Sequence, residues 1–434
     1  MKTEIRFKKT AVLLLAAALI GTVLAAFLPY ALESLLGLAA ACIAVHTIYL
    51  AYERFINPFW LSLLAIAISA VSVVLTLVLL IGHRLGLYTL IQALNLAVIG
   101  LSTFILLHKK WVFRAAICAL TAICLVFACF GAFSHIAYGR TVMATVSEWI
   151  LASNKVVDEK VEASFQALTE AGETTYTANP KAFDRRVSRG IYEGMPVLYV
   201  NTDGKRDRVL FYIHGGYYVY QMNAEHTTAI NRLVNATGAM AVVPIYPLAP
   251  FNTAEDSQEI MLGLFEQVRT DNPDSKIILM GDSAGGGYAL ALAEILAERG
   301  LDQPDELILL SPWVDVTMSN PEIKDYENVD PMLTVTMGRM SGEAWAGPLP
   351  TDDWHVSPIN GDLSKLRNVT VFVGDRELFT PDDTLLYEKL ADNENVRLIV
   401  GHGQNHVYPV YPTLEGRIAM EQIGAIIGRR EEMR

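Results

Sequence analysis

The stretch Lys276-Ile277-Ile278-Leu279-Met280-Gly281-Asp282-Ser283-Ala284-Gly285-Gly286-Gly287 decides the fold of the C-terminal half of this chain. Its opening apolar run predicts a buried strand, and a helical pattern begins at Ala284. The glycines around Ser283 allow a tight strand-to-helix turn with a strained backbone, which pushes the serine hydroxyl out over the sheet edge. A glycine-rich turn with a capping serine is the alternative. The strand before the turn and the helix after it favour a nucleophile.

Short apolar runs alternate with helical patterns on both sides of this turn. Strands are expected at 196–201, 209–214, 239–245, 276–281, 307–311, 369–374 and 396–401, and helices at 224–236, 253–270, 284–298, 381–391 and 413–429. This alternation predicts a mostly parallel sheet covered by helices on both faces, over residues 195–434. Residues 312–360 break the alternation and are expected to form a lid or cap insertion. Residues 141–194 are expected to be linker or cap helices, near 142–150 and 156–171.

Charge is distributed very unevenly along the 434 residues. Residues 1–140 contain 10 of the 34 basic residues and 3 of the 46 acidic residues. Residues 141–434 therefore carry 24 basic and 43 acidic side chains, a formal balance of −19. Such an acidic half argues against a nucleic-acid partner. The apolar content, 52% of the whole chain, excludes intrinsic disorder.

Residues 1–140 are predicted to be an all-α membrane domain in contact with membrane lipids. Their uncharged gaps are each long enough for a helix that crosses a hydrocarbon core of about 30 Å. Buried helices of a soluble protein, the alternative, would carry charged faces that this sequence lacks. Five spans are expected, near 11–29, 32–52, 59–81, 87–107 and 112–134.

The loops between these spans predict the orientation of the chain. With the N-terminus in the cytoplasm, eight basic residues lie inside and two, Arg84 and Arg140, lie outside. An odd number of spans then places the C-terminal half, residues 141–434, on the extracytoplasmic face of the cell membrane. The first span has features of a cleavable signal sequence around Leu24-Ala25-Ala26, but its long apolar run favours a retained anchor.

Metal and cofactor chemistry is not expected. All four cysteines, Cys42, Cys118, Cys124 and Cys129, lie inside predicted spans, and no Cys/His spacing suits a metal.

The segment His214-Gly215-Gly216-Tyr217 follows the expected strand at 209–214 and supplies a second chemical element. Attack of a serine on an ester creates an oxyanion, which preorganised amide donors stabilise. The donors predicted here are the N–H groups of Gly216, Tyr217 and Ala284. His214, Gly215 and Asp282 are expected to support the site, with His214 orienting the loop through hydrogen bonds.

Several of these motifs together resemble the hormone-sensitive-lipase-like branch of the α/β-hydrolases, a family of serine esterases. The matching segments are His214 to Gly216, Tyr246 to Pro250 with Asp256, Gly281 to Gly286, Leu310-Ser311-Pro312-Trp313 and Asp330-Pro331-Met332-Leu333. The resemblance covers about residues 195–412 and implies an α/β-hydrolase fold. Three features depart from the family pattern: Tyr217 where Gly or Ala is usual, Phe251 where an acidic residue is usual, and the N-terminal apolar domain.

The resemblance also guides the choice of base and acid, which should follow the nucleophile in the chain. His402 and His406 both lie on the loop after the last strand, and Asn405-His406-Val407-Tyr408 is more similar to the family, so His406 is predicted to be the base.

For the acid, many relatives have the segment Gly-x-x-Asp after this strand. Here Gly374 takes the place of the glycine, and Glu377, three residues later, takes the place of the aspartate. Asp375 follows the strand too closely and is expected to bind loop amides. Asp382 and Asp383 follow Pro381 and suit the first turn of a helix. Glu377 is predicted to be the acid, ahead of Asp375.

These residues predict a membrane-anchored serine hydrolase that cleaves small or lipid-like carboxylic esters through an acyl-enzyme on Ser283. Two alternatives stay open: an acyltransferase that passes the acyl group to an envelope alcohol, and a catalytically silent sensor with the same fold.

Overall fold

The computed structural model describes residues 133–134, 137–172, 179–204 and 207–428. The predicted membrane domain lies outside the described residues, apart from 133–134 and 137–140. Within the described part of the chain, every helix is too short or too polar to span a bilayer. The chain divides into two compact units, residues 1–146 and 147–434. In the first unit, the Ser134 hydroxyl donates to the carbonyls of Arg140 and Thr141.

The second unit contains one eight-stranded sheet in the order β1-β2-β4-β3-β5-β6-β7-β8. The pairs β1–β2 and β2–β4 are antiparallel and all others are parallel, so the mostly parallel sheet predicted from the sequence is confirmed. The strands are β1 (Val187–Tyr192), β2 (Met195–Val200), β3 (Arg208–Ile213), β4 (Met240–Pro244), β5 (Lys276–Asp282), β6 (Glu306–Leu310), β7 (Val369–Gly374) and β8 (Arg397–Gly401).

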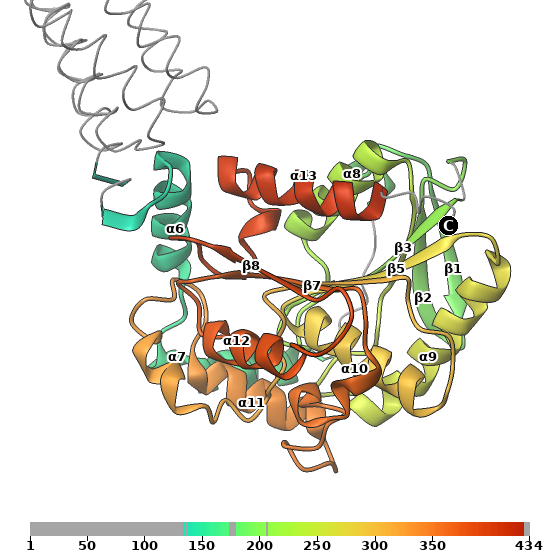
Figure 1. The fold of residues 1–434 in the computed structure, drawn as a ribbon. Coiled ribbons are helices and arrows are strands. Elements are labelled where there is room, and N and C mark those ends of the chain that lie inside the picture. Colours follow the sequence, from blue (N-terminus) through green and yellow to red (C-terminus); the bar gives the residue numbers. More distant parts are fainter. Residues whose placement is uncertain (1–132, 135–136, 173–178, 205–206, 429–434) are drawn as a thin grey trace, which may run out of the picture. The chain divides into compact units, whose positions relative to one another are not determined.

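Helices cover both faces of this sheet (Figure 1), with α8 and α13 on one face and α9, α10 and α12 on the other. The alternation within β3 explains the two layers, because successive side chains of a strand point to opposite faces. Val209 and Phe211 join the core under α9 and α10, whereas Leu210 and Tyr212 join the core under α8 and α13. The helices are α6 (Val142–Asn154), α7 (Asp158–Ala171), α8 (Ala224–Thr237), α9 (Ala254–Asp271), α10 (Ala284–Glu298), α11 (Val335–Ala346), α12 (Thr380–Lys389) and α13 (Leu414–Gly428).

The region 141–194 differs in one respect from its interpretation as linker or cap helices. Helices α6 and α7 form where expected, but β1 follows them and pairs with β2 through a tight turn. This edge strand leaves Ser188, Arg189 and Ile191 exposed, so it has no buried apolar face that a sequence pattern could reveal.

The segment 312–360, expected as a lid, packs many of its apolar side chains into the main core. Trp313 and Trp345 are fully buried, and both stack on the ring of Tyr218. Short 3₁₀ turns connect its parts and the neighbouring loops: Pro321–Asp325, Pro358–Asn360 and Leu363–Lys365, with others at Pro180–Ala182 and Tyr408–Val410.

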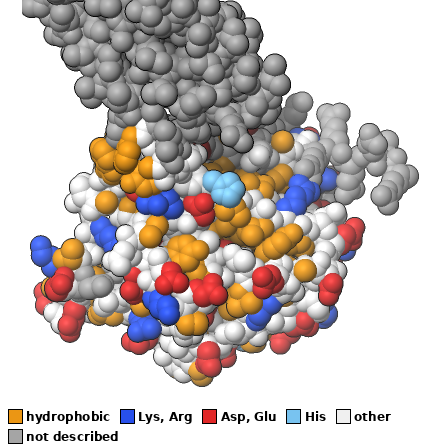
Figure 2. Space-filling view, turned by 60° about the vertical axis from the view of Figure 1, so that its left-hand side comes forward, with side chains coloured by type: hydrophobic (Ala, Val, Ile, Leu, Met, Phe, Trp, Pro, Cys, Tyr) orange, Lys and Arg blue, Asp and Glu red, His pale blue; other side chains and the backbone are white. Residues whose placement is uncertain are grey.

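Acidic, basic and hydrophobic side chains are interspersed over the face of the molecule shown in Figure 2. No broad area of a single charge covers that face.

Candidate active site

Ser283 lies at the sharp turn between β5 and α10, with φ 53° and ψ −123°. This left-handed φ is strained for a residue with a side chain. The turn closes because Gly285 approaches β3 so nearly that a Cβ there would lie 2.2 Å from the carbonyl oxygen of Ile213. The Ser283 N–H donates to the carbonyl of Leu310 at 2.8 Å, and its own carbonyl accepts from the Trp313 N–H at 2.9 Å. Neighbouring β6 therefore holds the strained backbone in place.

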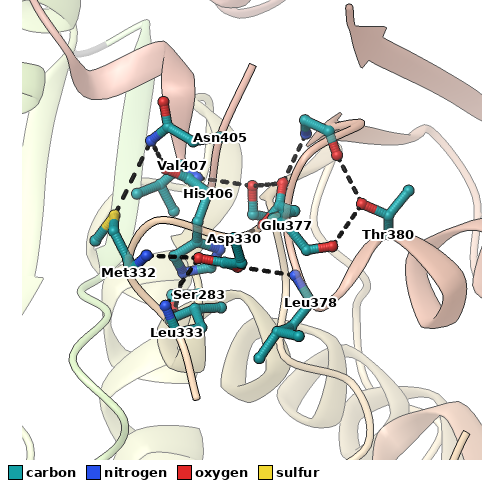
Figure 3. Close-up of polar contacts among 12 residues, drawn as sticks. Ser283, Asp330, Met332, Leu333, Glu377, Leu378, Thr380, Asn405, His406 and Val407 are labelled. Atoms are coloured by element: carbon teal, nitrogen blue, oxygen red, sulfur yellow. Dashed lines mark hydrogen bonds and ion pairs between the residues drawn. The ribbon is translucent and has the colours of Figure 1, made fainter. Parts of the chain in front are cut away.

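The three residues predicted as nucleophile, base and acid form one continuous hydrogen-bonded chain (Figure 3). His406 Nε2 lies 2.9 Å from Ser283 Oγ, and His406 Nδ1 lies 2.5 Å from Glu377 Oε2. All three side chains are buried, Glu377 completely. The structure thus brings together side chains 123 and 29 residues apart in sequence.

The second carboxylate oxygen of Glu377 fixes the acid in its loop. Oε1 accepts from the Gly374 N–H at 2.6 Å and from the Ser311 hydroxyl at 2.7 Å. The same Ser311 oxygen accepts from the Val407 N–H at 2.9 Å, next to His406. Ser311 thus joins the acid to the loop of the base. Ser311 lies in one of the segments that resemble the family, but nothing in its sequence context indicates this role.

Asp330, in the segment 312–360, supports the acid from its other side. Its Oδ2 accepts from the Leu378 N–H at 2.8 Å, and its Oδ1 accepts from the N–H groups of Met332 at 2.7 Å and Leu333 at 2.8 Å (Figure 3). Burial raises the pKa of Asp330, opposed by the nearby His406 and by these three amide donors. In the sequence, only the resemblance of Asp330-Pro331-Met332-Leu333 to the family pointed to this residue.

Electrostatics at His406 suit a proton acceptor. Burial lowers the pKa of its imidazole, but the charge and hydrogen bond of Glu377 raise it, and Asp330 and Asp282 add to that effect. The net result is a pKa above the usual histidine value. These surroundings favour the protonated form of the His406 imidazole.

The loop after β3 lies against the nucleophile. A Cβ on Gly215 would lie 2.9 Å from the Cβ of Ser283, so glycine is needed for this approach. Gly216 and Tyr217 have φ of 123° and 57°, and among the described residues nothing accepts a hydrogen bond from their N–H groups. Ala284 is the first residue of α10, where N–H groups have no partner within the helix. The three predicted donors are thus available, and their role in oxyanion binding stays a prediction.

Asp282 and His214 both form hydrogen bonds with this loop. Asp282 Oδ1 accepts from the Tyr212 hydroxyl at 2.6 Å and from the Gly215 N–H at 3.2 Å. His214 Nδ1 donates to the Gly215 carbonyl at 2.8 Å. Burial, followed by the nearby His226, lowers the pKa of His214 to about 4, so it is neutral at physiological pH.

His226, which sequence analysis did not single out, completes the support of Asp282. Its Nδ1 accepts from the Asn223 N–H at 3.0 Å, so the neutral ring carries its proton on Nε2, which donates to Asp282 Oδ2 at 3.1 Å.

The competing candidates lie elsewhere. His402 and Asp375 pair with each other at 3.2 Å, and the His402 side chain is 83% exposed. Asp375 also accepts from the Gly403 N–H at 2.7 Å, the loop-amide role expected for it. Asp382 and Asp383 lie in the first turn of α12, as expected. Among the residues that the structure describes, no group of three or more His, Cys, Asp or Glu side chains is arranged to hold a metal ion.

Comparison with known proteins adds independent information. A family model described as the alpha/beta hydrolase fold matches residues 210–410. An acetyl-hydrolase of Streptomyces hygroscopicus is 31% identical over 233 residues, which cover 51% of this chain and 75% of that protein. A triacylglycerol lipase of Mycobacterium tuberculosis is 31% identical over 184 residues, which cover 42% of this chain and only 38% of the lipase. The crystal structure of a hormone-sensitive lipase from a metagenome library is 26% identical, with a TM-score of 0.53, and the alignment covers 64% of this chain and 95% of that one.

The family match includes the strands and loops that carry Ser283, Glu377 and His406. The mostly parallel sheet and the relatives named lipase and acetyl-hydrolase agree with it. The chain belongs to the α/β-hydrolase fold family, and it is a carboxylic ester hydrolase.

Proposed function

We propose that Ser283, His406 and Glu377 are the catalytic triad of this esterase and that the reaction passes through an acyl-enzyme on Ser283. The observation that carries the proposal is the unbroken chain from Ser283 Oγ through both ring nitrogens of His406 to the buried Glu377. A nucleophile, a base and an orienting acid in this order are what serine acyl transfer requires.

Acylation begins when His406 Nε2 takes the proton of the Ser283 hydroxyl as its oxygen bonds to the ester carbonyl carbon. The carbonyl oxygen becomes an oxyanion, which the N–H groups of Gly216, Tyr217 and Ala284 stabilise. The carbon–oxygen bond to the alcohol then breaks, and the leaving oxygen takes the proton from His406. Water repeats the sequence on the acyl-enzyme, which releases the acid and restores Ser283.

Glu377 keeps the proton of neutral His406 on Nδ1, which leaves Nε2 free to act as the base. It also stabilises the imidazolium that forms in each half-reaction. Because Oε1 is held by Gly374 and Ser311, the carboxylate is already oriented before substrate binds.

The substrate proposed is a small or lipid-like carboxylic ester with a short acyl group. A row of aromatic rings ends at the base: Tyr217 packs edge-on against Trp313, Trp313 stacks with Phe379, and Phe379 meets His406 at 5.1 Å between ring centroids. Tyr217, itself a proposed oxyanion donor, adds a bulky side chain to the loop beside Ser283, which favours a small acyl group. The acetyl-hydrolase among the relatives agrees with this choice.

The test uses purified full-length protein and p-nitrophenyl acetate. We expect Ser283→Ala to lower kcat by more than about 10⁴-fold and to abolish labelling by a fluorophosphonate. Ser364→Ala, at an exposed position, is the matched control and should keep both. Substantial turnover by a folded Ser283→Ala variant would refute the proposal.

We further propose that residues 1–140 anchor the enzyme in the cell membrane and that the catalytic domain faces outside. The uncharged stretches and the eight-to-two distribution of basic residues support this arrangement. A fluorophosphonate that cannot cross membranes should label Ser283 in intact cells. A reporter that works only in the cytoplasm, fused after Arg434, should be silent, and a strong signal would contradict the orientation.

A further inference from the structure

Helix α6 contacts the loop of the catalytic acid through a paired ion bridge. Arg376 Nε lies 3.0 Å from Glu148 Oε2, and Arg376 Nη2 lies 3.1 Å from Glu148 Oε1. The side chains are only 23% and 10% exposed, so water screens the pair weakly. A bidentate bridge of this kind fixes orientation as well as distance. Arg376 directly precedes Glu377 in the chain.

The same arginine reaches the loop of the base through its backbone. The Arg376 N–H donates to the carbonyl of Gln404 at 3.0 Å, and Gln404 stands two residues before His406. Glu148 therefore holds Arg376, which belongs to the loop of the acid and is hydrogen-bonded to the loop of the base.

A second contact starts just beyond the end of α6. Lys155 Nζ donates to the backbone carbonyls of Asp330 at 2.7 Å and Glu327 at 3.1 Å. The carboxylate of Asp330 in turn accepts from the N–H of Leu378, the residue that follows Glu377. The two neighbours of Glu377 in the chain, Arg376 and Leu378, are thus each connected to the α6 segment, one directly and one through Asp330.

Neither contact is needed to explain the fold. The sheet, the nucleophile turn and the triad hydrogen bonds are all formed by residues after 186. Glu148 and Lys155 come from a segment before the sheet, yet both reach loops that carry or support the acid. Because proton transfer depends on the position of Glu377 and His406 to within a fraction of an ångström, small shifts of these loops affect the rate.

We propose that Glu148 and Lys155 are positioning residues for the esterase reaction. Glu148 holds Arg376 directly and Lys155 holds Leu378 through Asp330, so the residues on either side of Glu377 are both kept in place. The proposal rests on the triad proposed above. Loss of either contact lets the acid loop move, which weakens the bond between Glu377 and His406. The consequence is a lower kcat with little change in KM, because neither residue touches the substrate.

The experiment measures p-nitrophenyl acetate turnover by full-length Glu148→Gln, Lys155→Met and the double variant. Each rate is divided by the number of sites that a fluorophosphonate titrates, so that misfolded protein does not count. Glu259→Gln is the matched control, because it removes a carboxylate of α9 from an exposed pair with Arg299, the residue that follows α10. Lys155→Arg keeps a cationic donor and should retain activity.

We expect kcat per titrated site to fall about 10-fold or more in Glu148→Gln and in Lys155→Met. The acid limb of the kcat/KM profile should also move to lower pH. Glu377, with Asp330 and Asp282, raises the pKa of His406, and a looser contact with Glu377 lets that pKa fall. A merely structural role would change the melting temperature and leave the profile where it is.

Three outcomes would refute the proposal that Glu148 and Lys155 position the loop of Glu377. One is wild-type kcat and an unmoved pH profile in both variants. Another is a loss in Lys155→Arg as large as that in Lys155→Met. The third is the absence of turnover and of fluorophosphonate labelling in the wild-type enzyme. That result would refute the proposed triad itself, whereas the first two outcomes refute only the positioning role of Glu148 and Lys155.

Discussion

The carboxylate of Asp282 accepts a hydrogen bond from the backbone N–H of Gly215 at 3.2 Å. This bond ties the residue before the nucleophile to the loop that carries the proposed oxyanion donors. The same carboxylate is buried and is also held by Tyr212 and His226. The proposed nucleophile and the loop of the proposed oxyanion donors are thus held by the same carboxylate.

Replacement of that carboxylate should damage catalysis. In Asp282→Asn, the amide NH2 must face either the Nε2–H of His226 or the two donors Tyr212 and Gly215, so at least one donor loses its acceptor. We expect kcat to fall about 100-fold, comparable to the loss of one oxyanion donor, and the unfolding free energy to fall by about 3 kcal/mol. Kinetics and urea denaturation of the purified variant measure both. Asp203→Asn, in an exposed pair with Arg186, is the control, and equal kcat in the two variants would contradict the role of Asp282.

The identity of the acid is tested by two isosteric changes. Glu377→Gln removes the charge that orients and stabilises His406, so kcat on p-nitrophenyl acetate should fall about 10³-fold or more. Asp375→Asn should keep nearly normal kcat, because Asp375 pairs with the exposed His402. The reverse pattern would show that the acid has been assigned to the wrong residue.

Activity should depend on pH through His406. The base works only when unprotonated, so kcat/KM falls as the pH drops through the pKa of His406 in the free enzyme. The net effect of its surroundings places that pKa above the usual 6.5. The acid limb of the wild-type profile should therefore lie above pH 6.5, and in Glu377→Gln the limb should move to lower pH. A wild-type limb well below 6.5 would mean that Glu377 does not act on the imidazole as described.

Stability should depend on pH through a different residue, Glu294 on α10. Its side chain is buried, and neither carboxylate oxygen has a hydrogen-bond partner among the described residues. Burial, followed by the charge of Asp362, raises its pKa to about 9, while Lys389 opposes the shift. Since the folded state holds this proton and the unfolded state releases it near pH 4.5, the contribution of Glu294 to stability is greatest below 4.5 and is lost as the pH rises toward 9.

Removal of this group should flatten the pH dependence. Its contribution has a slope of up to about 1.4 kcal/mol per pH unit. Urea denaturation between pH 5 and 9 should give a smaller loss of unfolding free energy for Glu294→Gln than for the wild type. Identical slopes would show that Glu294 is not protonated in the folded protein.

Much of the catalytic half follows from local sequence. The strand before Ser283 and the glycines around it predict the turn, because strained backbone and close approach leave few other residues possible there. The strands of the parallel core are marked by runs of apolar residues buried on both faces. The sequence also predicts that Glu377 and His406 lie near each other. Each follows one of the last two strands, and the carboxyl ends of parallel strands lie at the same edge of the sheet.

The supporting residues do not follow from local sequence. Ser311, Asp330 and His226 act through contacts with residues 48 to 96 positions away, and no spacing in the chain marks them. Strand β1 was missed because its exposed edge position gives it no apolar face. The burial of Trp313 and Trp345 against Tyr218 could not be read from the sequence either, because these rings come from distant parts of the chain, and the role of 312–360 as a lid stays a prediction.

The long sequence separations within the site have a consequence for biosynthesis. Ser283 leaves the ribosome 123 residues before His406. At about 5 to 20 residues per second, the serine exists for roughly 6 to 25 s before its base has been made. With the proposed triad, the nascent chain gains esterase activity only after the loop of His406 has been made and has reached its place beside β7.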